Sequence, residues 1–430
     1  NLDYNNGVGV GVVNSGSAGS YYINVTDVHA VWRINPGDMV LIHQTQGANA
    51  GCWELNKAVS DFGGGTATYQ LQNPLSCNYA SGGNNHAQIQ RVPQYTDCPV
   101  SGTVTPLAAW NGSWGGIFAV MCSRTMNLTG AIDSIGYGFR GGALGYPSTV
   151  YGGQGESFGS PGSYNYVANA GGGGGGKYDT GSCPSGGKCV GAGGGGGGYG
   201  SNGDNGTSSG DSWRQPGLGG GTYGSADLST ALHLGSGGGG GGSDDSPNAP
   251  GGLGGNGGGI VVLSARNLLG NGAITAGGAN GQTKSSTDDA GRSGGGGGGS
   301  GGSILLRSFS ANTSSGQVKA LGGAGAPGNS NKGAPYGGNG GNGGVGRIRI
   351  EYCESFSGST DPTASTQKLN CYIAEQVESA PYTTTRLNLP ESFTGGRTYQ
   401  VQYGRRLVFG GAGEQVTTLR VPAGAFNSAS

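Results

Sequence analysis

GGGGGGSGGSILLRSFSANTSSGQVKALGGAG, residues 294–325, holds the pattern that decides the fold of this chain. Six glycines precede a short apolar strand, a polar turn, a second short apolar stretch and more glycine. Related stretches occur at 115–138 and 258–281, and 343–352 repeats the first half of the unit. The last three begin about 43 residues apart, and a glycine-rich insertion at about 139–257 follows the first. Such a repeat predicts stacked supersecondary units, here a β-solenoid-like core.

Runs of six glycines occur four times, at 171–176, 193–198, 237–242 and 294–299. One interpretation is flexible linkers. The other is polyglycine II, an extended left-handed helix with about three residues per turn and no internal hydrogen bonds. Such rods must bond to neighbouring rods, and the stretch GGNGGNGG at 337–344 has the three-residue period itself. We therefore favour packed polyglycine II rods between the strands.

The composition separates this chain from most disordered proteins. Glycine accounts for 102 of 430 residues, yet only 10% are charged and the net charge is −1. Disorder usually accompanies high net charge. There is no basic stripe for nucleic acid, no cationic amphipathic helix, and no apolar run near the ~20 residues of a transmembrane helix. We expect neither a nucleic-acid partner nor membrane insertion.

Three all-β regions are predicted. Residues 1–135 contain short β-rich runs separated by Gly, Asn, Pro and Ser, which indicates an N-terminal β domain. Residues 136–352 form the glycine-rich repeat region with polyglycine II rods. Residues 353–430 contain fewer glycines and read as a small C-terminal β domain, with paired strands at 398–409 and 415–426.

Eight cysteines, an even number, show no Cys-x2-Cys spacing of a zinc site. Disulfides are the natural interpretation, and they imply an oxidising, extracellular compartment. Neighbour pairing is our prediction, although spacing alone does not fix connectivity. The predicted pairs are Cys52 with Cys77, Cys98 with Cys122, Cys183 with Cys189, and Cys353 with Cys371.

A start at Asn1 fits a mature secreted chain. Five Asn-x-Ser/Thr sequons are candidate glycosylation sites, which would make the protein a glycoprotein. They are Asn24, Asn111, Asn127, Asn205 and Asn312.

Catalytic signatures were sought and no motif for them emerged. The histidines His29, His43, His86 and His233 form no HExxH motif, and we expect them at the surface or in turns. There is no nucleophile elbow and no phosphate-binding loop. No motif marks a pair of glycosidase carboxylates either. We therefore predict that the chain is not an enzyme.

Two acidic pairs flank six-glycine runs and are candidate calcium ligands: Asp244-Asp245 and Asp288-Asp289. Calcium takes carboxylate and carbonyl oxygens, and a glycine-rich loop offers both. A charged loop tip that keeps the chain soluble is the stronger interpretation. We expect no metal and no cofactor, with calcium as the open alternative.

Many of the 20 tyrosines stand beside glycine. Exposed Tyr on a stiff frame offers large contact area at small entropic cost. The competing interpretation, slightly favoured, is that these rings cover the glycine rods as core. They are Tyr137, Tyr146, Tyr151, Tyr178, Tyr199, Tyr223 and Tyr336.

Three stretches carry a resemblance: PGDMVLIHQTQGA (36–48), the segment 90–120 with its RVPQYT motif, and TGAIDSIGYGFRGG (129–142). In these, and in the later GGGGGGSGGSILLRS and GGVGRIRIEY, the chain resembles glycine-rich bacterial surface and secreted proteins, an adhesin-like family. The resemblance covers roughly residues 30–352. It implies a cell-surface module and brings no catalytic residues.

We expect a structural subunit of an extracellular filament or surface sheath, with other copies of itself as partners. Subunits would join through β edges at GVGVGVV (7–13) or in the C-terminal strands, because an open edge is a template for pairing. The alternative is a cell-surface adhesin that binds glycan or receptor through Tyr/Gly-rich loops. A carbohydrate-active enzyme on a β-solenoid is the weakest of the three hypotheses.

Overall fold

The structure, a computed structural model, is all-β. No helix occurs among the residues it describes: 4, 8–27, 33–60, 65–146, 148–177, 190–208, 215–244, 249–284, 292–312, 317–329, 336–369, 375–379 and 382–386. Strands account for the antiparallel N-terminal part and for two parallel sheets. The predicted β-rich fold class is therefore confirmed at this level.

The N-terminal part is a closed antiparallel barrel. Its strands are β1 (Val10–Gly16), β2 (Tyr22–Asp27), β3 (Met39–Gln46), β4 (Trp53–Lys57), β5 (Thr66–Gln70), β6 (Tyr79–Ala80) and β7 (His86–Arg91). They follow the order β4-β3-β7-β1-β2-β5, with β6 beside β1. An antiparallel bridge between Ala58 and Leu71 joins the two ends of this order. Inward-facing apolar residues such as Val13, Val25 and Ile89 fill the barrel.

The N-terminal strand is therefore not an open edge, and this part of the assembly hypothesis is wrong. Val10–Val13 of β1 pair with β7 on one side, and Gly11–Gly16 pair with β2 on the other. The alternation of Gly and Val suited an edge strand and an interior strand equally well. Closure of the barrel by residues far along the chain decided between them.

Two parallel sheets follow. The larger contains β8 (Gln94–Tyr95), β9 (Cys98–Val100), β11 (Ile117–Leu128), β13 (Ile260–Gly270), β15 (Ser303–Asn312), β17 (Arg347–Ser357) and β19 (Ser365–Lys368). The smaller contains β10 (Thr103–Val104), β12 (Ala131–Asp133), β14 (Ala273–Thr275), β16 (Val318–Lys319) and β18 (Thr360–Asp361). Both run in parallel throughout.

The strands of the larger sheet stack in the order of the sequence repeat, with the predicted register in the first three and a shift of two residues in the fourth. Ile117 lies opposite Ile260, Ile260 opposite Ser303, and Ser303 opposite Arg347. Each repeat gives one strand to each sheet, and apolar side chains fill the space between the sheets, among them Phe118, Ile132, Val261, Ile274 and Ile304. The other face of the larger sheet packs against the barrel through residues that include Leu41, Trp53, Ile117, Ile260 and Leu305.

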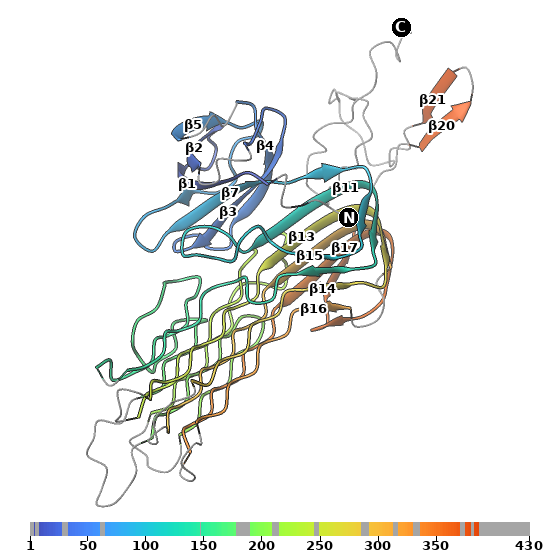
Figure 1. The fold of residues 1–430 in the computed structure, drawn as a ribbon. Helices are drawn as coiled ribbons and strands as arrows, with labels where there is room; N and C mark the ends of the chain where they lie inside the picture. The colour runs from blue at the N-terminus through green and yellow to red at the C-terminus, as the bar shows by residue number, and fades with distance from the viewer. Residues whose placement is uncertain are drawn as a thin grey trace, which may run out of the picture.

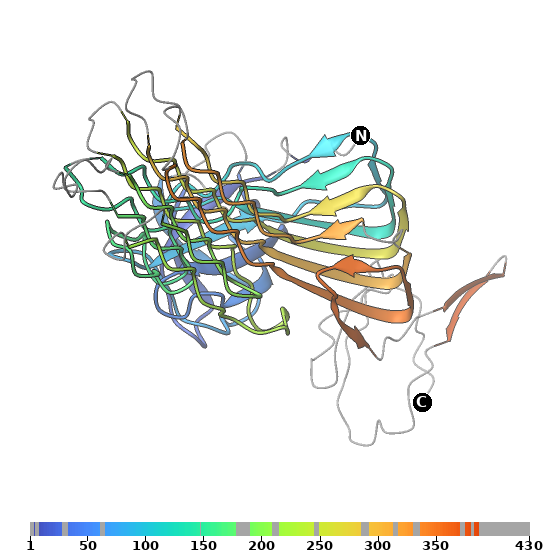
Figure 2. The ribbon, with the colours of Figure 1, turned by 90° about the horizontal axis from the view of Figure 1, so that it is seen from below.

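The glycine segments continue from the parallel strands as a bundle that projects away from both sheets (Figures 1 and 2). After β12, β14 and β16 of the smaller sheet the chain runs out along the bundle, turns and returns into the next long strand. The insertion at about 139–257 contributes segments to this same bundle, for example Gly193–Gly198, which bond to segments on both sides.

The predicted regions are linked by strand pairing. Strands β11 and β12 precede residue 135 and pair with β13 and β14 beyond it, and β17 crosses residue 352. In the C-terminal region the structure describes an antiparallel pair, β20 (Glu375–Ser379) with β21 (Tyr382–Arg386). The strands predicted at 398–409 and 415–426 lie outside the described residues.

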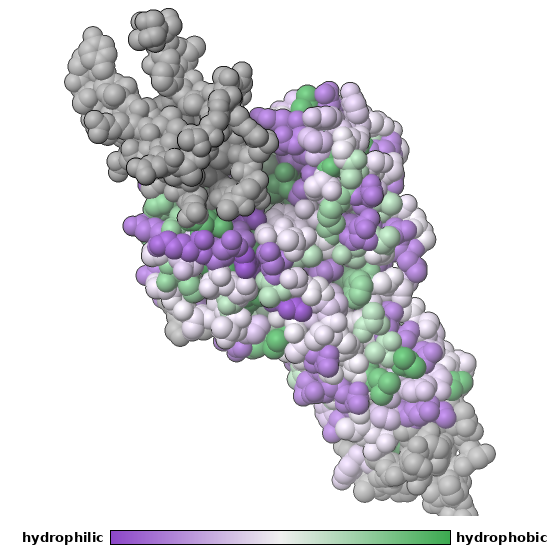
Figure 3. All heavy atoms as spheres, turned by 180° about the vertical axis from the view of Figure 1, so that it is seen from behind, coloured by the Kyte–Doolittle hydropathy of each residue, from purple (hydrophilic) through white to green (hydrophobic). Residues whose placement is uncertain are grey.

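The face drawn in Figure 3 mixes hydrophilic and weakly hydrophobic residues, and strongly hydrophobic ones occur there in small groups. No helix long and apolar enough to cross a membrane is found in the part of the chain that the structure describes.

Candidate functional site

The bundle's interior is made by the four six-glycine runs, and every residue in these runs is buried. In the run Gly237–Gly242 each amide N–H donates to a neighbouring segment at 2.8–3.0 Å. The acceptors are, in chain order, the carbonyls of Glu156, Gly255, Gly195, Gly153, Gly252 and Ala192. The same three segments thus recur after three residues, so the run turns through one revolution in three residues.

The other interior runs bond in the same way. Gly193, Gly194 and Gly195 donate to Thr207, Gly295 and Gly174, and the next three residues return to those segments. Three directions of bonding satisfy amides that have no partner within their own segment. These hydrogen bonds argue against the interpretation of the runs as floppy linkers.

Only glycine fits this interior. A Cβ built on Gly239 would clash with the Gly174 carbonyl oxygen, and one on Gly297 would clash with the Gly195 carbonyl oxygen. Backbone atoms are the obstacle in both cases, so a rotamer change would not relieve the clash. The uninterrupted glycine is required by close approach of neighbouring backbones.

The outer segments of the bundle differ from the interior glycine runs, because one residue in three faces the solvent. Exposed positions recur at Leu321, Ala324 and Pro327 and again at Tyr336, Asn339 and Asn342. The larger side chains stand at these exposed positions, which explains the pattern Gly-Gly-x in GGNGGNGG.

Outward-pointing asparagines accept hydrogen bonds from backbone amides of adjacent outer segments. The Oδ1 acceptors and N–H donors are Asn202 with Thr222, Asn205 with Gly219, Asn256 with Gly141, Asn280 with Ala324, Asn339 with Gly328, and Asn342 with Gly325, at 2.8–3.0 Å. The three-residue spacing of Asn within glycine was the available signal for this role, and sequence reasoning missed it.

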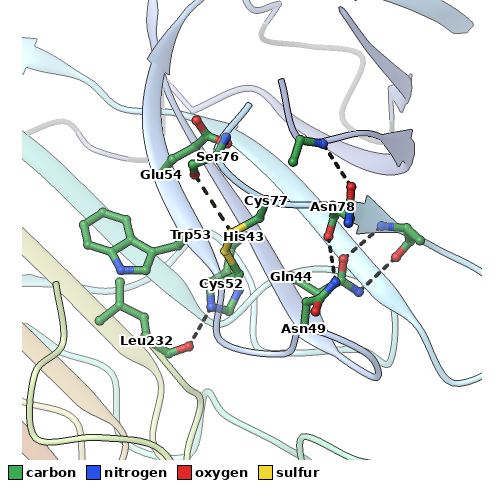
Figure 4. The surroundings of a disulfide bond; sticks show 12 residues. His43, Gln44, Asn49, Cys52, Trp53, Glu54, Ser76, Cys77, Asn78 and Leu232 are labelled. Atoms are coloured by element: carbon green, nitrogen blue, oxygen red, sulfur yellow. Dashed lines mark hydrogen bonds between the residues drawn. A yellow bond between two sulfur atoms is a disulfide. The ribbon is translucent and has the colours of Figure 1, made fainter. Parts of the chain in front are cut away.

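Buried polar residues join the barrel to the rest of the molecule. His43 lies near the Cys52–Cys77 disulfide and points at Leu232 (Figure 4). Its Nε2 lies 2.9 Å from the Leu232 carbonyl, which can only accept, so Nε2 carries the proton. Nδ1 lies 2.9 Å from the Thr45 hydroxyl. Burial lowers the pKa of His43 to about 4, because the imidazolium would lose its water.

A second buried histidine sits in an aromatic cluster. His233 packs edge-on against Tyr223 at 5.2 Å and against Tyr199 at 5.9 Å between ring centroids. Burial, followed by the charges of His43 and Arg347, lowers the pKa of His233 to about 3. The expectation of surface histidines is thus wrong for His43 and His233, because contacts distant in sequence bury them. His29 lies outside the described residues.

Glu156 connects the bundle to the barrel through hydrogen bonds. It is almost fully buried, and it accepts hydrogen bonds from the Arg140 guanidinium at 2.9 Å and from the Gln46 amide at 3.3 Å. A buried carboxylate needs such donors. Arg140 belongs to the GFRGG motif and Gln46 to the VLIHQTQG motif, so the contact connects two stretches that carried the family resemblance.

Of the predicted disulfides, Cys52–Cys77 and Cys98–Cys122 are present. Cys353 is also disulfide-bonded, while its predicted partner Cys371 lies outside the described residues, as do Cys183 and Cys189.

The predicted glycosylation sites lie at the surface, exposed or half-exposed: Asn24, Asn111, Asn127, Asn205 and Asn312. Their modification stays a prediction. Asn205 would keep its Oδ1 acceptor for Gly219 if its Nδ2 carried a glycan.

Of the two acidic pairs predicted as candidate calcium ligands, the described residues include Asp244. Asp244 is buried and its carboxylate accepts a hydrogen bond from the Arg292 amide at 3.0 Å. Asp245, Asp288 and Asp289 lie outside the described residues. Among the residues that the structure describes, no group of three or more His, Cys, Asp or Glu could hold a metal ion.

The tyrosines divide into two classes. Tyr199 and Tyr223 stack at 4.7 Å inside the molecule, which agrees with the core interpretation. Burial raises the pKa of Tyr199 to about 12. Tyr146 and Tyr336 are exposed, and Tyr178 lies outside the described residues.

No protein-family model, curated protein or solved structure matches this chain. The function is therefore inferred from the molecule's own geometry.

Proposed function

We propose that this protein is a structural subunit of an extracellular filament or surface sheath, with the glycine bundle as its rigid projecting part. The three-directional hydrogen bonding of the four six-glycine runs carries the proposal. It is the bonding expected of polyglycine II helices in a close-packed array, built on a solenoid-like stack of repeats. Such a bundle stiffens a chain through its backbone alone.

Disulfides support the extracellular location, because they persist in oxidising compartments. The absence of Asp, Glu, Lys and Arg from 253–259, 276–283 and 320–329 supports assembly, since these outer segments present amide, hydroxyl and apolar groups to a neighbour. We take the protein to act mechanically, without catalysis, and its partners to be further copies of itself.

The β18–β19 end of the parallel sheets is our candidate joint. Within the described residues the ladder partner of β19 is β17. The opposite edge strand β9 contains Pro99, which lacks an amide donor and is typical of protected edges. A contact between unlike surfaces that does not close on itself produces an open filament.

A proline on β19 tests this joint. The Leu369 amide donates to Tyr352 of β17, and alternate residues point their peptide groups to opposite sides, so the Thr366 amide faces away from β17. Thr366→Pro should therefore spare the fold and shorten or abolish filaments, while Thr366→Ala should leave them unchanged. Filament length is read by negative-stain microscopy.

The same microscopy of unaltered native protein tests the proposal itself. Long uniform fibres that dissociate into this chain would support it. Discrete particles at every concentration, together with a constant sedimentation coefficient, would overturn it.

The second candidate is a cell-surface adhesin that binds glycan or receptor. A specific observation favours it, since exposed aromatic and aliphatic side chains gather on one hairpin of the bundle. A surface fibre can carry such a site, so the two candidates are compatible.

A further inference from the structure

One hairpin at the side of the glycine bundle differs from the other outer segments. Gly153 and Tyr164 form an antiparallel bridge, and the Gln154 amide donates to the Ser163 carbonyl at 2.7 Å. The pairing places Tyr151 against Tyr166, with ring centroids 5.7 Å apart and planes tilted by 32°. We call the side chains of Tyr146, Val150, Tyr151, Tyr164, Tyr166 and Val167 the tyrosine patch.

The patch is open to solvent. The exposed fractions are 46% for Tyr146, 39% for Val150, 49% for Tyr164 and 43% for Val167. Exposed large apolar groups are ordinary when scattered, whereas a contiguous group marks an interaction site. Val150 adjoins Tyr151 in the chain, Tyr164 and Val167 lie within two residues of Tyr166, and the Tyr146 amide bonds to the Thr149 hydroxyl, so these exposed groups gather around one ring pair.

Backbone strain occurs at the centre of the patch. Val150 has φ of +61°, a conformation that a β-branched residue rarely adopts. Across Val150, the Tyr151 amide donates to the Thr149 carbonyl at 2.7 Å, which is the hydrogen bond of a γ-turn. The Thr149 hydroxyl also bonds to Tyr146 and Tyr151. Strain of this kind, about 1–3 kcal/mol, clusters at ligand sites.

Amide side chains are fixed beside the rings. Gln154 donates to the Val167 carbonyl at 2.7 Å and accepts from the Ser163 amide at 2.8 Å. The Tyr151 hydroxyl donates to Gln215 at 3.3 Å. Rings with apolar faces and polar edges, next to amide and hydroxyl groups, match a ligand with both apolar and hydroxylated surfaces.

The lack of charged side chains around the patch restricts the chemical class of the ligand further. Residues 141–155 and 157–176 contain no Asp, Glu, Lys, Arg or His. Glu156 is buried against Arg140, and Lys177, paired with Tyr151 through the backbone, is the flanking charge. A site for an acidic or basic ligand would present several opposite charges.

We propose that the tyrosine patch is a binding site for a neutral glycan. Sugar rings lay their C–H faces on Tyr164 and Tyr146, and sugar hydroxyls bond to the amides beside them. The site rests on the adhesin candidate and is independent of filament formation.

Binding is tested on the full chain with an array of neutral, sialylated and sulfated glycans, followed by titration calorimetry with the best neutral oligosaccharide. Tyr164→Ala should weaken binding about tenfold or more, the equivalent of losing one anchoring contact. Tyr22→Ala is the matched control, because Tyr22 is 55% exposed on the barrel strand β2 and should leave affinity unchanged.

Three outcomes would overturn the proposal: no neutral glycan binds, only acidic glycans bind, or Tyr164→Ala binds as tightly as the parent. Loss of self-association in Tyr164→Ala without glycan binding would also overturn it, by assigning the patch to a second copy. Filaments are scored by microscopy on the same samples. Glycan binding by discrete particles would support this site while refuting the filament.

Discussion

Replacing a single glycine has different consequences in the interior and on the surface of the bundle. In the interior, the neighbour that a side chain would strike is backbone, as for Gly239 against Gly174. On the surface, a Cβ on Gly221 would have its nearest neighbour, the Ala170 carbonyl oxygen, 3.7 Å away. One added methyl group therefore distinguishes the two environments.

We predict that Gly239→Ala lowers the free energy of unfolding by about 3 kcal/mol or more, since segments on both sides must separate. Gly221→Ala should be neutral or stabilising by up to about 1 kcal/mol, because Ala restricts the unfolded chain. Denaturant unfolding of the two variants measures the difference. Equal stability of both would contradict the packed interior.

The two buried histidines make the protein acid-sensitive. Their folded pKa values, about 4 for His43 and about 3 for His233, lie below the ordinary 6.5. The unfolded chain therefore binds more protons, and stability falls as pH drops from about 6.5 through 4. The loss from His43 alone is on the order of 3 kcal/mol.

Urea unfolding midpoints at pH 7 and pH 4.5 check this dependence. The parent protein should lose stability between the two values. His43→Gln should lose less between them, although it starts lower at pH 7. Identical pH profiles for parent and variant would show that His43 is not responsible.

Residue types predicted the bundle better than they predicted its junction with the barrel. The six-glycine runs and the three-residue period favoured close-packed rods over flexible linkers, because so much uninterrupted backbone needs partners for its peptide groups. The burial of His43 and His233 could not be predicted, because it results from contacts that form only in the folded chain. His43 contacts Leu232, and His233 contacts Tyr223. The Asn caps, such as Asn205 and Asn342, were visible in the pattern and were overlooked.

Among the elements, β1 is the clearest case in which pattern alone misleads. GVGVGVV was expected to be an edge available to a second subunit. The barrel instead places Val10–Val13 between β7 and β2. The alternation of Gly and Val predicts a strand. Which strands pair with it is decided by closure of the barrel through the Ala58–Leu71 bridge.

Deletion of residues 1–13 should accordingly prevent the barrel from forming, because it removes the strand that joins β7 to β2. Near-ultraviolet circular dichroism and formation of the Cys52–Cys77 disulfide report on the barrel. Adding a synthetic peptide of residues 1–16 should restore part of the signal. A truncated chain with native spectra and disulfide would contradict the central place of β1.

The parallel strands were predicted more successfully than the barrel. The repeat of about 43 residues translated directly into register, from Ile260 to Ser303, because each unit must bury its apolar stretch against the next. The two disulfides followed chain neighbours, as expected. The residues on the exposed side of the bundle could not be predicted from the sequence, because Tyr151 and Tyr166 come together only when the hairpin forms.

On the scale of the whole molecule, a barrel, a stack of parallel sheets and a glycine bundle share buried contacts. Leu41 and Trp53 pack the barrel onto the larger sheet, while Gln46 and Glu156 tie it to the bundle. The bundle projects from the sheets (Figure 1). These contacts join the three parts into one body, which is what the proposed structural role requires.

The central claim is that the six-glycine runs are a hydrogen-bonded interior. Hydrogen exchange of the native protein, followed by mass spectrometry of peptides that cover 171–176, 193–198, 237–242 and 294–299, tests it most directly. The account predicts protection of these amides comparable to that of β13 and β15 in the larger parallel sheet. Exchange at the rate of an unstructured peptide would contradict it and return these runs to the role of flexible linkers.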